Sequence, residues 1–153
     1  MHGPITVTRR HALAGGLGMA SLLVLRPALA LPAEMNAAIA ELTGNAPLRR
    51  GRVVLDLPPL VENGNSVSVT VKVPDSPMTP ADHVRRLAIF TEQNPQPNVA
   101  VFHLGPRSGR AVATTRMRLA TSQKVVAVAG LSDGSWWSDQ IEVIVTLAAC
   151  VEG

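Results

Sequence analysis

Residues 66–73, Ser-Val-Ser-Val-Thr-Val-Lys-Val, alternate without interruption between valine and a polar or charged side chain. Because successive side chains of a β-strand point to opposite faces, the four valines share one face and the polar residues share the other. Valine, branched at Cβ, also favours strands. The stretch therefore predicts a strand in an antiparallel sheet that has one face on a hydrophobic core and one face toward water.

The chain on either side continues this pattern of short apolar runs separated by turns. Pro58-Pro59 ends the run before the alternating stretch, the loop Asn-Pro-Gln-Pro-Asn separates two later runs, and Asp133-Gly134 is a turn signal before the last run. About seven short strands at this spacing are typical of an all-β sandwich. The predicted strands are 51–64, 66–73, 84–93, 98–104, 110–120, 124–131 and 136–147.

One segment before the strands has a different period. Met35, Ile39 and Leu42 lie at helical spacing, and Gly44 follows them. Glycine commonly ends a helix because it adopts the left-handed conformation without a steric penalty. Residues 31–44 therefore predict a short N-terminal helix ahead of the sandwich.

The first 30 residues have the layout of an export signal. Arg9 and Arg10 precede an apolar run at 12–25 that is rich in glycine and alanine, and the segment closes on the small-residue box at 28–30. The arginine pair indicates the twin-arginine route, with removal after Ala30 and delivery to the periplasm. A membrane anchor is the alternative, but the run is short for a span. We expect a signal at 1–30, a sandwich domain at 31–147 and a tail at 148–153.

The charge balance depends on that signal. The chain has 14 Lys and Arg against 11 Asp and Glu, and the signal holds three of the arginines and no acid. Removing these three leaves 11 basic residues, equal to the number of acidic ones. The remaining chain has no basic excess that would favour nucleic acid or an anionic membrane surface, so we expect neither as a partner.

The chain has a single cysteine, Cys150, so an intramolecular disulfide is excluded. If the last strand continued in phase, its odd positions from Trp137 to Leu147 would form the apolar face, with Asp139 as the polar exception. Cys150 would then point away from the core, on an extended tail that reaches roughly 13 Å from Thr146. A thiolate is a strong nucleophile that can hold a substrate covalently. A buried inert thiol and an intermolecular disulfide are the alternatives.

Other residue types that carry chemistry give weaker patterns. His83 and His103, with Met78, Met117 and Cys150, contain copper-ligand types, but no spacing typical of a metal site supports one, so we expect no metal or other cofactor. His103 follows a strand pattern and is interpreted as a partly buried residue. No Ser/His/Asp set, carboxylate pair or glycine-rich phosphate loop stands out, so no catalytic residue is assigned.

Two further groups are interpreted as structural. Trp136 and Trp137 would place one ring on each face of the last strand, one in the core and one at a rim or interface. Arg107 and Arg110, followed by two arginines in the next predicted strand, are expected to be solvated. They would bind an anion only if the fold brought them together.

Three stretches together resemble the SoxY family, the substrate-carrying subunit of the bacterial thiosulfate-oxidation complex. They are "DSPMTPADHVRRLAIFTEQNPQPNVAVFHLGPRSGRA", "TRMRLATSQKVVAVAGLSDGSWWSD" and a valine-rich last strand followed by a lone cysteine. The resemblance covers nearly all of the chain after the signal. It implies an immunoglobulin-like antiparallel sandwich that pairs with a SoxZ-like sandwich subunit.

The resemblance also implies a function without turnover of its own. A SoxY-like protein carries sulfur species as covalent adducts on the tail cysteine, which matches Cys150 here. The implied partners are a c-type cytochrome complex that attaches thiosulfate, a hydrolase that releases sulfate, and a sulfane dehydrogenase. The chain is therefore expected to be a carrier and not an enzyme.

The tail differs from that of the family, which is Gly-Gly-Cys-Gly-Gly. Here Ala148 and Ala149 precede the cysteine, and Val151 and Glu152 follow it. Alanine and valine restrict the backbone more than glycine does, and Glu152 adds an anion near the thiol. The alternative function is an exported immunoglobulin-like binding or structural module whose tail cysteine is idle or forms an intermolecular disulfide.

Overall fold

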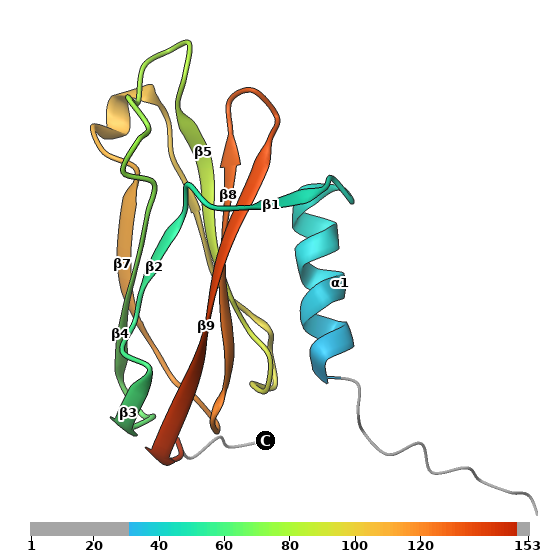
Figure 1. Cartoon of the computed structure of the whole chain (residues 1–153), viewed down its shortest axis with the longest axis vertical. Coiled ribbons are helices and arrows are strands. Elements are labelled where there is room, and N and C mark those ends of the chain that lie inside the picture. Colours follow the sequence, from blue (N-terminus) through green and yellow to red (C-terminus); the bar gives the residue numbers. More distant parts are fainter. Residues whose placement is uncertain (1–30, 150–153) are drawn as a thin grey trace, which may run out of the picture.

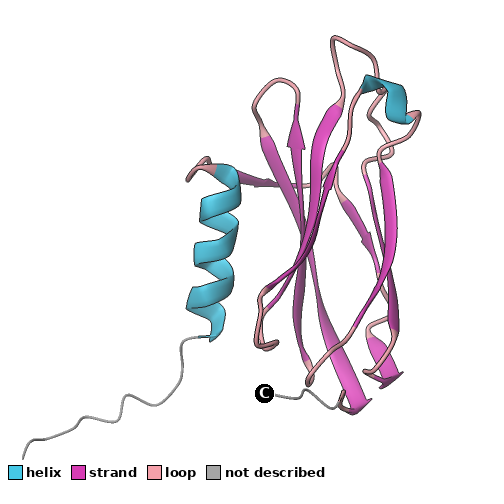
Figure 2. Ribbon diagram, turned by 180° about the vertical axis from the view of Figure 1, so that it is seen from behind, coloured by secondary structure: helices cyan, strands magenta, loops and turns pink. Residues whose placement is uncertain are grey.

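The computed structural model describes residues 31–149. The predicted export signal at 1–30 and Cys150, with the three residues after it, lie outside the described residues. The described residues form two β-sheets packed face to face, and a single α-helix lies beside the larger sheet (Figures 1 and 2). The all-β, immunoglobulin-like sandwich with a short N-terminal helix is thereby confirmed.

The larger sheet has six strands. Its hydrogen-bonded order is β1-β9-β8-β5-β6, and β3 also pairs with β9. The smaller sheet has the order β2-β4-β7. The bounds of the larger sheet are β1 Leu48–Arg50, β3 Leu60–Asn63, β5 Val84–Thr91, β6 Asn98–His103, β8 Gln123–Leu131 and β9 Trp136–Leu147. Those of the smaller sheet are β2 Val54–Asp56, β4 Val67–Lys72 and β7 Val112–Met117, and a 3₁₀ turn spans Pro106–Ser108.

The core lies between the two sheets, and β4 contributes the alternating residues that predicted it. Val67, Val69 and Val71 are buried, and Val73 continues the row just beyond the strand. The larger sheet contributes inward-facing side chains to the same core, such as Leu87 of β5. The burial of aliphatic side chains between two sheets is the main source of stability in this architecture. The buried residues of this cluster on β5, β8 and β9 are Val84, Leu87, Ile89, Val125, Ala127, Ala129, Leu131 and Val143.

A second, smaller core lies on the outer face of the larger sheet, under helix α1 (Leu31–Thr43). Met35 is buried there against a cluster formed by Ala88, Phe90, Val126 and Val128. Strand β5 from Leu87 to Phe90 and strand β8 from Val125 to Leu131 are therefore buried on both faces, which explains why these stretches are continuously apolar instead of alternating. The helix ends as predicted at Gly44, whose φ is +63°.

Residues 31–149 contain nine strands where the sequence predicted about seven. The segment 51–64 was expected to contain one strand, ended by Pro58-Pro59, but it contains β2 before these prolines and β3 after them, in different sheets. Strand β1, Leu48–Arg50, was not predicted at all, because three residues with two arginines show no alternation. Both β1 and β3 run parallel to β9, so the sheet is not purely antiparallel.

Strand β9 spans the predicted residues, Trp136–Leu147, and bonds to three other strands. Of its expected apolar face, Val143 is buried, and Trp137, Ile141 and Val145 pack against the main core. Leu147 departs from the expectation, since β9 extends past the core at that end and leaves this side chain 58% exposed. Trp136 packs on the opposite face, in the cluster under α1, so the two tryptophans lie on opposite faces as predicted.

Candidate functional site

The end of the described chain is held against the sandwich and does not extend freely from it. Ala149, the residue before the predicted attachment cysteine, is only 4% exposed, and its backbone N–H donates to the carbonyl oxygen of Leu119 at 3.0 Å. Leu119 follows β7 and is itself fully buried. The backbone on the N-terminal side of Cys150 therefore has a fixed partner.

Gly64, which follows β3, connects the same segments. Its N–H donates to the carbonyl oxygen of Leu147 at 2.8 Å, and its carbonyl oxygen accepts from the N–H of Leu119 at 2.8 Å. Together with the bond from Ala149, these backbone hydrogen bonds join the end of β9 to the segments after β3 and after β7. We call this set of residues, Gly64, Leu119, Leu147 and Ala149, the Gly64 junction.

The tail that was expected to leave the sandwich at Thr146 does not do so. The hydroxyl of Thr146 donates to the carbonyl oxygen of Glu62 at 3.0 Å, and Leu147 is in register with Asn63 of β3. The expected reach from Thr146 is therefore wrong, because strand pairing and the Gly64 junction hold the chain as far as Ala149. Cys150 itself lies outside the described residues, which end two residues after β9, and the arrowhead of β9 is at the lower end of the sandwich in Figure 1.

This end of the molecule also exposes large apolar side chains. Leu60 of β3 and Ile144 of β9 are partners in the strand register and are 57% and 60% exposed. Leu147, two residues before Ala149, is exposed to a similar extent. Five large apolar residues are strongly exposed among residues 31–149, and these three lie on the paired strands β3 and β9 that lead to the chain end.

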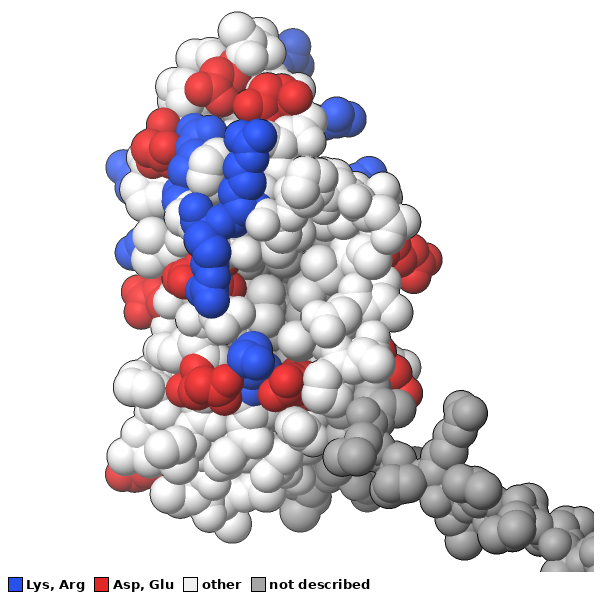
Figure 3. All heavy atoms as spheres, turned by 45° about the vertical axis from the view of Figure 1, so that its right-hand side comes forward, with Lys and Arg blue, Asp and Glu red and all other residues white. Residues whose placement is uncertain are grey.

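The other end of β9 carries a cluster of charged and aromatic residues. The guanidinium groups of Arg49 and Arg52 lie 5.6 and 5.7 Å from the ring centroid of Trp137, within cation–π range. Arg52 also pairs with Asp75 at 2.7 Å. In Figure 3, basic side chains gather in the upper half of the face shown and acidic side chains border them. The cluster thus combines cation–π contacts to Trp137 with an ion pair between Arg52 and Asp75.

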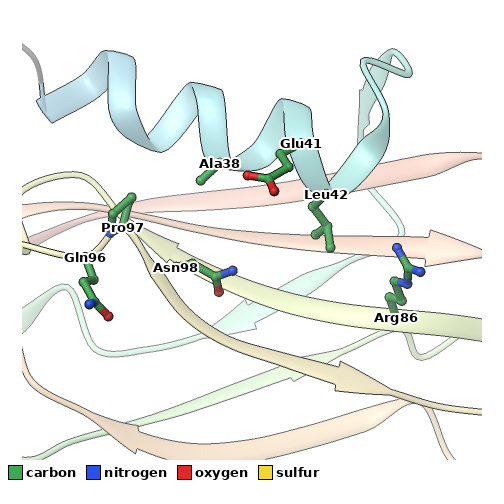
Figure 4. A pocket seen from close by; sticks show the side chains of 7 residues that line it. All are labelled: Ala38, Glu41, Leu42, Arg86, Gln96, Pro97 and Asn98. Carbon is green, nitrogen blue, oxygen red and sulfur yellow. The ribbon is translucent and has the colours of Figure 1, made fainter.

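A groove lies between α1 and the β5–β6 hairpin and has a volume of about 510 Å³. Figure 4 shows Glu41 and Leu42 of the helix on one side of this groove, with Arg86 of β5 and Asn98 of β6 on the other. No lining residue belongs to the Gly64 junction, and none is a cysteine or histidine. The groove is therefore lined by neither a thiol nor an imidazole, and it is separate from the Gly64 junction. Its lining residues are Ala38, Glu41, Leu42, Arg86, Gln96, Pro97 and Asn98.

The two histidines and Met78 are not brought together as ligands. The Nδ1 atom of His83 lies 3.1 Å from the carbonyl oxygen of Thr79, and the sulfur of Met78 is buried and accepts from the N–H of Val84 at 3.4 Å. His103 is exposed, so its interpretation as a partly buried residue is wrong; β6 is an edge strand, and this side chain lies at its end. Among residues 31–149, no three His, Cys, Asp or Glu side chains cluster as metal ligands would.

The arginines of the 107–118 region are exposed, as expected. Arg107 belongs to the 3₁₀ turn and Arg110 follows it, whereas Arg116 lies near the far end of β7 and Arg118 just after it. They are spread along the smaller sheet instead of forming one site.

None of the helices within the described residues is long and apolar enough to cross a membrane.

Comparison with known proteins identifies relatives for this arrangement. A family model described as "Sulfur oxidation protein SoxY" matches residues 39–150, so the matched region ends at Cys150. The fold is similar to the sulfur carrier protein SoxY from Chlorobium limicola f thiosulfatophilum, with a TM-score of 0.63 and 28% identity over 74% of this chain and 93% of that one. No curated protein sequence matches the chain.

The sandwich is also similar to those of superoxide reductases. The enzyme (neelaredoxin) from Ignicoccus hospitalis gives a TM-score of 0.54 at 19% identity, over 62% of this chain and 80% of that one. The enzyme from Nanoarchaeum equitans gives 0.54 at 12% identity, over 63% and 100%. At these identities the likeness concerns the fold alone.

Proposed function

Because this chain belongs to the SoxY family of sulfur oxidation proteins, we propose that it is a periplasmic carrier that holds sulfur intermediates covalently on Cys150. The observation that carries the proposal is the position of the chain end. The Gly64 junction holds Ala149, itself only 4% exposed, at the end of the sandwich, and Cys150 is the next residue and the last one matched by the family model. A carrier needs its attachment atom at the surface, where other proteins reach it.

The chemistry at Cys150 is the formation and cleavage of sulfur–sulfur bonds. The thiolate and the outer sulfur of thiosulfate join as Cys–S–S–SO₃⁻, and two electrons pass to a c-type cytochrome complex. Water then attacks the sulfonate sulfur in a hydrolase, which leaves Cys–S–S⁻ and releases sulfate and two protons. A sulfane dehydrogenase oxidises the remaining outer sulfur. The thiolate is the reactive form because the thiol is a poor nucleophile.

The proposed assembly has two levels. A SoxZ-like sandwich subunit forms a stable heterodimer with this chain, and the cytochrome complex, hydrolase and dehydrogenase meet the carrier in turn. The twin-arginine signal at 1–30 directs export, and the sandwich and the tail then act in the periplasm. The carrier supplies the attachment point, and its partners supply the catalytic groups.

The first test is the replacement of the attachment residue. Cys150→Ser keeps a side chain of nearly the same size but lacks the sulfur that forms the bond, so we expect complete loss of adduct mass with unchanged folding. Intact mass spectrometry of the protein isolated from its own periplasm, with and without reductant, measures this directly. A wild-type protein that carries only the unmodified thiol after exposure to thiosulfate and periplasmic cytochromes would overturn the proposal.

The same measurement separates the alternative function. An immunoglobulin-like module with an idle cysteine gives one clean mass. A module that uses Cys150 for an intermolecular disulfide gives a dimer that reductant abolishes. Either result would argue for a binding or structural role of the sandwich.

A further inference from the structure

The Gly64 junction lies directly beside the proposed attachment residue, and it is built from backbone atoms of three distant segments. Its hydrogen bonds, Gly64 to Leu147, Leu119 to Gly64 and Ala149 to Leu119, are 2.8, 2.8 and 3.0 Å long. Leu119 is fully buried and Ala149 nearly so. Gly64 is buried as well, whereas Leu147 is 58% exposed. Each of the three bonds therefore involves a backbone group of a buried residue, and that group would be left without a partner if the bond broke.

Only glycine fits at position 64. A Cβ atom there would overlap the carbonyl oxygen of Leu119, and it would lie 3.0 Å from the nitrogen of Ala149 and 3.1 Å from a methyl carbon of Val145. Two of these neighbours are backbone atoms, which cannot rotate away as the end of a side chain could. A side chain at position 64 would therefore clash sterically with the carbonyl oxygen of Leu119 and the nitrogen of Ala149. These two atoms form the hydrogen bond that holds Ala149.

We propose that Gly64 is a positioning residue of the carrier, which keeps Ala149, the residue before Cys150, bound to Leu119 at the end of the sandwich. This inference rests on the proposed function. Consecutive Cα atoms are about 3.8 Å apart, so an anchored Ala149 confines the start of the tail whatever conformation the later residues adopt. The tail that carries the sulfur species begins at Cys150 and not at Thr146.

The anchored tail determines where partner proteins must approach. A short tether cannot carry its cargo far, so an enzyme that acts on the adduct has to contact the end of the sandwich itself. Leu60, Ile144 and Leu147 are the exposed apolar residues on that part of β3 and β9. Apolar side chains that a partner buries contribute to association. If the tail were a long free arm, a partner could act on the adduct without contacting this surface.

The direct test uses Cys150, the single cysteine, as the site of a nitroxide spin label attached to the full-length chain through a disulfide. Electron paramagnetic resonance then reports how freely the label moves. We expect restricted motion in the wild type and several-fold faster motion in Gly64→Ala. Gly105→Ala is the matched control, because a Cβ atom at position 105 meets nothing within 4 Å; its spectrum should equal that of the wild type.

A second variant covers the case in which Gly64→Ala fails to fold. Ala149→Pro removes the one N–H that donates to Leu119, and it lies at the chain end, so the sandwich should fold and the label should again move faster. Equal spectra for wild type, Ala149→Pro and folded Gly64→Ala would overturn the proposal. So would a wild-type label as mobile as one on the urea-unfolded chain.

The labelling result is independent of any sulfur chemistry, so its failure is distinct from failure of the carrier function. A chemical loading reaction provides the link between the two. Tetrathionate reacts with the thiolate to give Cys–S–S–SO₃⁻ and expels thiosulfate, without an enzyme. Loading is measured by intact mass. If all variants load equally, the junction affects the position of the thiol and not its reactivity. If both junction variants load more slowly, the junction has a role in reactivity, and a purely positional role is overturned.

Discussion

Asp133 shows how one side chain organises the turn between β8 and β9. Its carboxylate accepts from the hydroxyl of Ser135 at 2.6 Å and from the N–H of the same residue at 2.8 Å. The hydroxyl of Ser135 in turn accepts from the indole N–H of Trp137 at 2.9 Å. The hydrogen bonds from Ser135, with smaller contributions from nearby Arg52 and Arg49, hold the pKa of Asp133 below its ordinary value.

Replacement of Ser135 tests this account. Ser135→Ala removes the side-chain hydrogen bond, which is the largest cause of the shift, so the pKa of Asp133 should rise toward its ordinary value. NMR titration of the Asp133 carboxyl measures the change. Ser68→Ala, on the exposed face of β4 in the other sheet, should leave that pKa unchanged, and an equal rise in both variants would contradict the assignment.

The sign of the pH dependence follows from the direction of the shift. Because the folded state binds the Asp133 proton more weakly than the unfolded state does, the ionised carboxylate stabilises the fold. This contribution is fully present above the ordinary pKa and is lost as the pH falls through the lowered one. The Ser135→Ala variant should lose part of this acid-dependent contribution.

At the scale of elements, Asp139 connects the two sheets. It was the polar exception on the predicted apolar face of β9, and its side chain accepts from the backbone N–H of Leu55 in β2 at 2.9 Å. Leu55 is buried, so its N–H needs a partner. The polar exception in the pattern of β9 is thus a side chain that accepts the backbone hydrogen bond of β2 in place of a neighbouring strand.

Asp139→Ala should therefore destabilise the sandwich. The unsatisfied N–H of Leu55 is expected to cost about 1–3 kcal/mol in the free energy of unfolding, measured by urea titration. Asp139→Asn retains an oxygen that can accept and should lose less. Equal stability of the alanine variant and the wild type would mean that water or another group satisfies Leu55.

How much of each element the sequence predicts depends on how its residues are buried. Strand β4 follows strict alternation, and β9 has a long apolar face with a turn before it, so both were predicted closely. Strand β1 has only Leu48 and two arginines, and its pairing with β9 is set by tertiary contacts that leave no local pattern. The division of 51–64 between two sheets likewise depends on which neighbour each half meets.

At the scale of the whole molecule, α1 acts as a third layer that covers the outer face of β5 and β8. Met35→Asp would place a charge against Phe90 and Val128, which burial disfavours strongly. We expect the helix to detach, with a loss of at least about 2 kcal/mol in the free energy of unfolding and increased binding of a dye such as ANS. Asn36→Asp adds the same charge at an exposed neighbouring position and should do neither.

The candidate site was only partly predictable from sequence. The lone cysteine and the family resemblance indicated Cys150, and that assignment remains a prediction because the residue lies outside the described range. The Gly64 junction was missed, because backbone groups of three distant segments form it and the pattern around Gly64 resembles an ordinary turn. A glycine that is required for space, with no positive φ, leaves little local signal.

The pairing of β9 with β1, β3 and β8 has a consequence for how the protein is made. Of the described strands, β9 is the last to be synthesised, and it pairs with strands from the first third of the described chain. Such long-range pairings form late in folding. The sandwich therefore stays incomplete until β9 has been synthesised, and a chain cut short before Trp136 would lack the strand that joins β1 and β3 to the larger sheet.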